Sequence, residues 1–137
     1  MNLDDVIGEL RAALDTIDGL RVAEWGAAKV SAPAAVVLPP ERIEYGTTYG
    51  AGCDRYPDVW VMVLVDDPTN WRAFKELAPY CAGSGSSSVR AVVEGYAYTA
   101  CDPQTVKVTE GEFDVVKYAG IPYLAAIFHI DITGTED

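Results

Sequence analysis

The chain has 137 residues, half of them hydrophobic, and its 21 acidic and 10 basic residues give a net charge of −11. This length predicts one domain over residues 1–137, and this composition argues against a disordered chain. The charge argues against sequence-specific DNA binding, the absence of about 18 consecutive apolar residues argues against a membrane span, and the acidic start MNLDD is unlike a secretion signal.

The first part of the chain predicts a helix followed by short strands. Apolar residues at helical spacing indicate an amphipathic helix over Leu3–Ile17, with Asn2 as the N-cap and Gly19 as the stop signal. Leu20–Trp25 and Ala34–Leu38 are apolar and short, which is typical of strands. The second of these ends at two prolines, which cannot donate to a strand ladder.

An extended loop is predicted over residues 44–58, although residues 42–45 alternate weakly and could continue the preceding strand. A connection of about 12 residues is long for a compact domain and is more often functional or disordered than structural. Tyrosine and arginine are frequent in interface hot spots. We therefore expect a docking arm in which Tyr45, Tyr49, Arg55 and Tyr56 contact a partner, with Cys53 as a bystander.

The centre of the chain predicts a buried strand and a pair of helices. Val59–Val65 is apolar at every position, which favours a central strand covered on both faces. Asp67 and Pro68 are typical of a helix start, and the helix that follows would bury a stripe that includes Trp71 and Phe74. Residues 82–88 predict a flexible linker before a shorter helix over residues 87–94.

The last part of the chain predicts two long paired strands. The first covers residues 105–118 with a bend near Gly111, and the second covers residues 122–132 after a turn at Ala119-Gly120. One face of the second strand is apolar and is expected to be core. The other face is mixed, as in a half-solvated sheet or a subunit contact, so Tyr123 and His129 join the predicted interface residues.

This element order predicts an α+β fold. We expect a single mixed or antiparallel sheet of about four to five strands. The N-terminal helix and the central helix pair would pack mainly on one of its faces.

Catalytic, cofactor and metal sites are not predicted. His129 is the only histidine, and pairing it with Cys53 would leave no identifiable third member of a catalytic triad. The three cysteines are widely spaced, which favours free thiols over a disulfide or a zinc site. GSGSSSV before a helix lacks the lysine of a phosphate-binding loop, and the acids of EGEFD lack the full spacing of a calcium loop.

Three stretches resemble the tail terminator proteins of long-tailed, siphovirus-type bacteriophages of actinobacteria. They are PAAVVLPPERIEYGTTYGAGCDRY over residues 33–56, VWVMVLVDDPTNWRAFKELAPYCAGSGSSSVRAVVE over residues 59–94, and FDVVKYAGIPYLAAIFHIDITG over residues 113–134. The similarity covers nearly the whole chain. It lies in patterns of strands, helices and turns and not in a catalytic signature.

The resemblance implies a structural virion protein and not an enzyme. Such a protein forms a ring, typically of six copies, that caps the tail tube, ends its polymerisation and joins the tail to the head-side neck. Its partners would be further copies of itself, the tail tube protein and a neck or connector protein, with DNA only passing through an acidic lumen. It would be assembled in the host cytoplasm and located in the virion. Another neck component, a tail completion or head–tail connector subunit, is the alternative, followed by a small enzyme or ligand-binding domain.

Overall fold

The fold is the predicted α+β type, with one mixed five-stranded sheet and its helices on one face. The computed structural model describes residues 2–23, 32–45, 53–99 and 105–135. The sheet order is β1-β2-β3-β5-β4, and the strands are β1 (Arg21–Ala23), β2 (Ala34–Leu38), β3 (Cys53–Leu64), β4 (Thr105–Tyr118) and β5 (Ile121–Thr135). β1 and β2 are parallel, and the other neighbouring pairs are antiparallel.

Side-chain N-caps explain where two of the helices begin. In α1 (Leu3–Asp15), the Asn2 side chain accepts a hydrogen bond from the Asp5 amide at 3.2 Å, as predicted. In α3 (Val89–Gly95), the buried Ser88 hydroxyl accepts from the Ala91 amide at 3.1 Å and donates to the Ala82 carbonyl. Within the described ranges, no helix is long and apolar enough to cross a bilayer.

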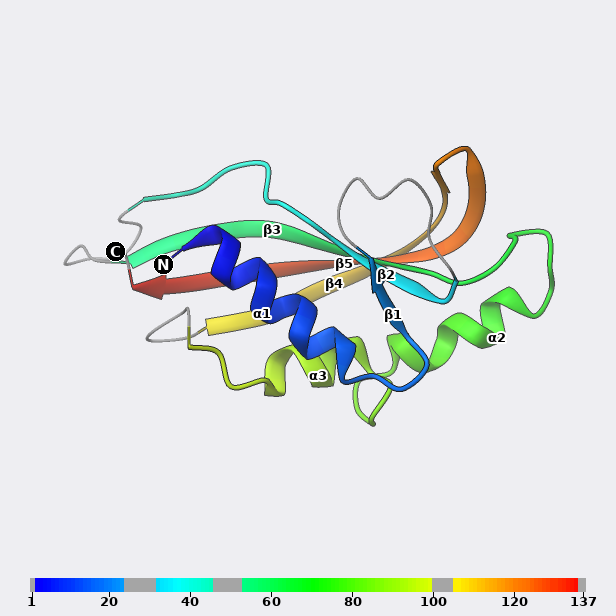
Figure 1. The fold of residues 1–137 in the computed structure, drawn as a ribbon, viewed down its shortest axis with the longest axis horizontal. Helices are drawn as coiled ribbons and strands as arrows, with labels where there is room; N and C mark the ends of the chain where they lie inside the picture. Colours follow the sequence, from blue (N-terminus) through cyan, green and yellow to red (C-terminus); the bar gives the residue numbers. More distant parts are fainter. Residues whose placement is uncertain (1, 24–31, 46–52, 100–104, 136–137) are drawn as a thin grey trace.

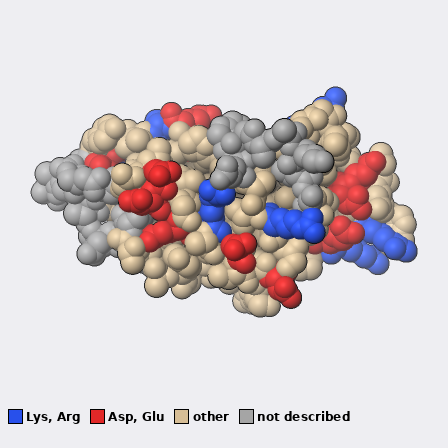
Figure 2. All heavy atoms as spheres, viewed as in Figure 1, with Lys and Arg blue, Asp and Glu red and all other residues tan. Residues whose placement is uncertain are grey.

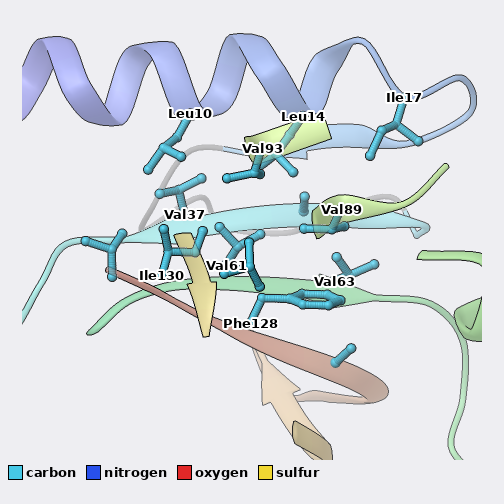
Figure 3. Packing of buried hydrophobic residues seen from close by; sticks show 14 of the residues in the cluster. Leu10, Leu14, Ile17, Val37, Val61, Val63, Val89, Val93, Phe128 and Ile130 are labelled. Atoms are coloured by element: carbon cyan, nitrogen blue, oxygen red, sulfur yellow. The ribbon is translucent and has the colours of Figure 1, made fainter. Parts of the chain in front are cut away.

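The main core lies between the helices and one face of the sheet. Leu10, Leu14 and Ile17 point from α1 and the turn after it toward the strands, and Val61 and Phe128 belong to the same cluster on the sheet side (Figure 3). The face of β5 that was predicted to be core belongs to this cluster. That face consists of Leu124, Ala126, Phe128, Ile130 and Ile132.

The second face of the sheet carries a smaller apolar cluster. It contains Met62 and Leu64 of β3, Tyr123 and Ile127 of β5, and further residues from β2 and β4. Because Val61 and Val63 face the helices, β3 is buried on both sides, as its uninterrupted apolar run predicted. The second face is thus apolar near the turn between β4 and β5, and polar toward the other end of the sheet.

The predicted loop over residues 44–58 is wrong at its C-terminal end, because β3 begins at Cys53. The strand pairs with β5 from Cys53 to Tyr56, and its register shifts between Tyr56 and Val59. Pro57 lies at this bulge, where the ladder does not need its missing amide hydrogen. Glu44 and Arg55 also form an isolated bridge, with backbone hydrogen bonds of 2.8 Å in both directions.

The first central helix begins later than predicted. Asp67 does not cap it, because its carboxylate accepts from the Thr69 amide at 2.9 Å and from the Thr69 hydroxyl at 2.7 Å, closing an Asx turn. α2 covers only Ala73–Leu77 and continues into a 3-10 turn, Ala78–Cys81. The predicted buried stripe is therefore broken, and Trp71 and Phe74 are 70% and 60% exposed.

The hairpin at the end of the chain is close to the prediction. The turn at Ala119-Gly120 places both residues at positive φ, 52° and 82°. Glycine adopts this conformation without strain, which suits position 120. The bend in β4 falls at Thr109, between the pairs of Val108 and Glu110, and not at Gly111. α1 begins and β5 ends at one end of the sheet, whereas α2 and the hairpin turn lie at the other (Figure 1).

Candidate functional site

The residues predicted to contact a partner differ widely in exposure. Tyr45 is 74% exposed, which suits a contact residue. Tyr56 is 2% exposed and belongs to the main core, so its predicted role in a docking arm is wrong for this chain. The alternation of β3 turns it toward the helices. Tyr123 is 9% exposed in the second apolar cluster, and Tyr49 lies outside the described residues.

Arg55 is held by carboxylates of its own chain and is not a free arm. Its Nε and Nη2 donate to Asp131 at 2.9 and 2.8 Å, and its Nη1 donates to Glu44 at 3.0 Å. Hydrogen bonding to Asp131 raises the pKa of Arg55 above its ordinary value, despite an opposing effect of burial. This Arg55 network joins β3, β5 and residue 44, so we assign it a structural role.

His129 lies at the centre of a second polar group on the same face of the sheet, which we call the acid–histidine cluster: Asp58, Glu110, Glu112 and His129. The His129 ring is edge-on to Trp60, with ring centroids 5.1 Å apart, and the residue is 7% exposed. Its Nδ1 is hydrogen-bonded to Asp58. Its Nε2 lies 2.9 Å from Glu112 Oε1, and Glu110 is the residue opposite it on β4.

The bulge in β3 explains how Asp58 reaches the ring. Asp58 has a φ of 62°, in the left-handed region that aspartate and asparagine tolerate better than most residues. Because the register shifts between Tyr56 and Val59, the Asp58 side chain turns toward the strand that carries His129. Sequence reasoning missed this contact because a bulge at Pro57 leaves no periodic signal.

The acids around His129 favour its protonated form. Burial lowers the pKa of His129, but the hydrogen bond and charge of Asp58 and the charges of Glu112 and Glu110 raise it above its ordinary value. Partial burial is the largest single influence on Asp58 and raises its pKa, but the hydrogen bond and charge of His129 and the side chain of Trp60 together hold the pKa below its ordinary value. Arg42 also favours the charged form of Asp58.

An Asp–His pair of this kind occurs in nucleophilic enzymes, where the second ring nitrogen activates a hydroxyl or thiol. Here that nitrogen faces carboxylates. The predicted alternative partner, Cys53, pairs with residue 135 of β5, whereas His129 pairs with Trp60. At about 3.3 Å per residue, the strand places positions 129 and 135 roughly 20 Å apart. The two residues are therefore not brought together.

A third feature is an apolar patch at the sheet edge, formed by Phe74 of α2 and Phe113 and Val115 of β4. These side chains are 60%, 56% and 50% exposed. The rings of Phe74 and Phe113 lie 6.2 Å apart, and Val115 lies two residues along β4 on the same face. Sequence reasoning missed the patch because it treated Phe74 as core and made no prediction about the exposure of Phe113 and Val115.

A pocket of about 410 Å³ adjoins this patch. Phe113 is one of its walls, and Phe128 and Ala126 line it from β5. Arg90 and Lys107 supply positive charge, and Cys81 supplies a thiol whose pKa is raised by burial. A raised pKa leaves this thiol protonated and unreactive near neutral pH. The pocket thus extends the apolar patch and does not form a nucleophilic site.

Comparison with known proteins leaves this geometry without an assigned role. No family model matches the sequence, and no curated protein matches it.

Proposed function

We propose that this chain is a structural virion protein, a tail terminator that forms a ring on the tail tube, ends its growth and joins it to the head-side neck. The whole-chain resemblance motivates the proposal. The apolar patch of Phe74, Phe113 and Val115 is the structural observation that supports it best, because a ring subunit needs a surface for the next copy. Its proposed role is assembly and not catalysis.

The position of the patch favours contact with another copy of the chain. β4 is an edge strand of 14 residues, and an edge can pair with a second chain. Here the bulge at Thr109 interrupts the ladder, and charged side chains at Glu110, Glu112 and Asp114 discourage uncontrolled pairing. The contact would therefore form through the apolar side chains beyond the bulge, with the neighbouring pocket receiving part of the partner.

The remaining partners follow from the same proposal. The neighbouring ring of tail tube protein and a neck protein would meet the other surfaces of the ring, with the exposed Tyr45 and the segment that contains Tyr49 as contacts. On the face viewed in Figure 2, acidic side chains form several separate groups with basic side chains between them. The net charge of −11 suits a protein through which DNA passes without binding.

Self-association tests the role of the patch, and the chain offers a matched control. Val115→Ser and Ile121→Ser make the same kind of change at two side chains that are each 50% exposed. Val115 lies in the patch, whereas Ile121 lies at the hairpin turn on the opposite face of the sheet. Sedimentation velocity and negative-stain electron microscopy would measure the assembly state of each protein.

We expect the unmodified protein to form closed rings at high concentration, Val115→Ser to shift it toward monomer, and Ile121→Ser to leave it unchanged. Either surface substitution should alter the free energy of unfolding by less than about 0.5 kcal/mol. A protein that stays monomeric at every concentration, or equal weakening by both substitutions, would contradict the proposed ring contact.

A further inference from the structure

The acid–histidine cluster has the donor set of a metal site. Glu110, Glu112 and His129 each offer one ligand atom, and these atoms all lie within 4.8 Å of one another. The sheet produces this grouping, because Glu110 is opposite His129 across the β4–β5 ladder and Glu112 is two residues along on the same face. Both glutamates are exposed, so an ion and its water ligands can reach the group from solvent.

Asp58 fixes the tautomer and the ring orientation of His129. A charged carboxylate only accepts hydrogen bonds, so the bond between Asp58 and Nδ1 places a proton on Nδ1. The lone pair of a neutral ring is then on Nε2, on the side of the glutamates. A histidine that donates to a carboxylate through one nitrogen and presents the other is the usual arrangement of a metal-ligating imidazole.

The second observation is that Nε2 has no hydrogen-bond partner in the part of the chain that the structure describes. His129 is more than nine-tenths buried, and Nε2 itself is inaccessible to solvent. Glu112 Oε1 lies 2.9 Å from Nε2, but the two are out of alignment for a hydrogen bond. A neutral imidazole and a carboxylate at this distance present lone pairs to each other, which is unfavourable unless a positive charge lies between them. A proton on Nε2 can supply that charge, and a metal ion that displaces the proton can supply it in the same place.

The distance between His129 and Glu112 fits a shared cation. Two ligand atoms at about 2.1 Å from Zn²⁺, separated by roughly 90–110°, lie about 3.0–3.4 Å apart. The 2.9 Å between Nε2 and Glu112 Oε1 is close to the short end of this range. Within the described residues, neither Glu110 nor Glu112 forms an ion pair with lysine or arginine.

We propose that Glu110, Glu112 and His129 bind one divalent transition-metal ion of the Zn²⁺ class, with Asp58 as the positioning residue for His129. One imidazole and two carboxylates favour such a metal over Mg²⁺ or Ca²⁺, which prefer oxygen ligands alone. Water would complete the coordination on the solvent side. The site is independent of the ring contact, because the apolar patch lies on the opposite face of the sheet.

The single histidine gives this proposal a direct readout. The full chain, treated with chelator and kept reduced, would be titrated with zinc chloride while long-range ¹H–¹⁵N spectra follow the His129 ring nitrogens. We expect Nε2, and not Nδ1, to show the shift of metal coordination. An imidazole spectrum unchanged by excess zinc would overturn the proposal.

Calorimetry with matched variants tests the ligand set. Glu112→Gln should weaken zinc binding at least tenfold, and Asp58→Asn should weaken it about tenfold by removing the group that orients the ring. Asp114→Asn removes the same charge two residues further along β4, on the same face as Glu112. Because Asp114 is outside the donor set, this control should leave the zinc affinity within about twofold. Equal losses in Glu112→Gln and Asp114→Asn would show non-specific attraction to an acidic surface and would overturn the site.

Discussion

The Arg55 network and the acid–histidine cluster lie on the same face of one sheet, yet they differ in charge balance. In the first, one guanidinium lies between two carboxylates and forms three well-aligned hydrogen bonds of 2.8–3.0 Å to Asp131 and Glu44. In the second, one imidazole is surrounded by three carboxylates and has one nitrogen without a hydrogen-bond partner among the described residues. The first group is complete without a ligand, whereas the second has excess negative charge available for a cation.

Breaking the Arg55 network should have the largest effect on stability. Arg55→Met keeps an apolar stem but leaves Asp131 and Glu44 without their shared cation. Loss of charged hydrogen bonds at this partly exposed position should lower the free energy of unfolding by about 2 kcal/mol, measured by urea denaturation. Arg42→Met is the control, because Arg42 is 68% exposed and contacts only Glu44 among these carboxylates. The control should lose less than about 0.5 kcal/mol. Equal losses in the two variants would contradict the structural role assigned to Arg55.

The pair of Asp58 and His129 should contribute less, and its contribution should depend on pH. The pKa of His129 is raised, so its contribution is complete below the unfolded value of about 6.5 and is lost as pH rises through the folded value. The pKa of Asp58 is lowered, so its contribution is present above about pH 3.9 and is lost as the solution becomes more acidic. Both contributions are therefore present between about pH 3.9 and pH 6.5.

Asp58→Asn is the variant that tests this pH dependence, because asparagine tolerates the positive φ at this position. In chelator-containing buffer, the substitution should cost about 1 kcal/mol near pH 5.5 and less at alkaline pH. Thermal unfolding of both proteins across this range would measure the difference. A cost that grows as pH rises from 5.5 would show that the pair is not the ionised Asp58–imidazolium contact described above.

The elements with strong periodicity could be predicted from the sequence. α1 follows its apolar spacing and its Asn2 cap, β5 follows its alternation, and the turn at Ala119-Gly120 follows its glycine. In each case the local pattern and the buried surface agree. The buried strand within residues 59–65 was equally clear, because no loop would carry such an uninterrupted apolar run.

The features that could not be predicted depend on partners distant in sequence. Tyr56 and Arg55 read as loop residues beside glycines and a proline, and only pairing with β5 turns one into the core and the other toward Asp131. The Asx turn at Asp67 competes with helix capping at the same residue, since both use its carboxylate. The acid–histidine cluster depends on the register between three strands and on the bulge in β3, and neither the register nor the bulge is visible in local spacing.

The most direct test of the proposed function is the length of tails assembled without this protein. If the chain is a tail terminator, deletion of its gene from the genome that encodes it, followed by electron microscopy of the lysate, should show tubes that exceed the normal length. A plasmid copy of the unmodified gene or of Ile121→Ser should restore uniform tails, and Val115→Ser should not. Tails of normal, uniform length beside unjoined or leaking heads would assign the chain to a head-side connector, and would contradict a terminator.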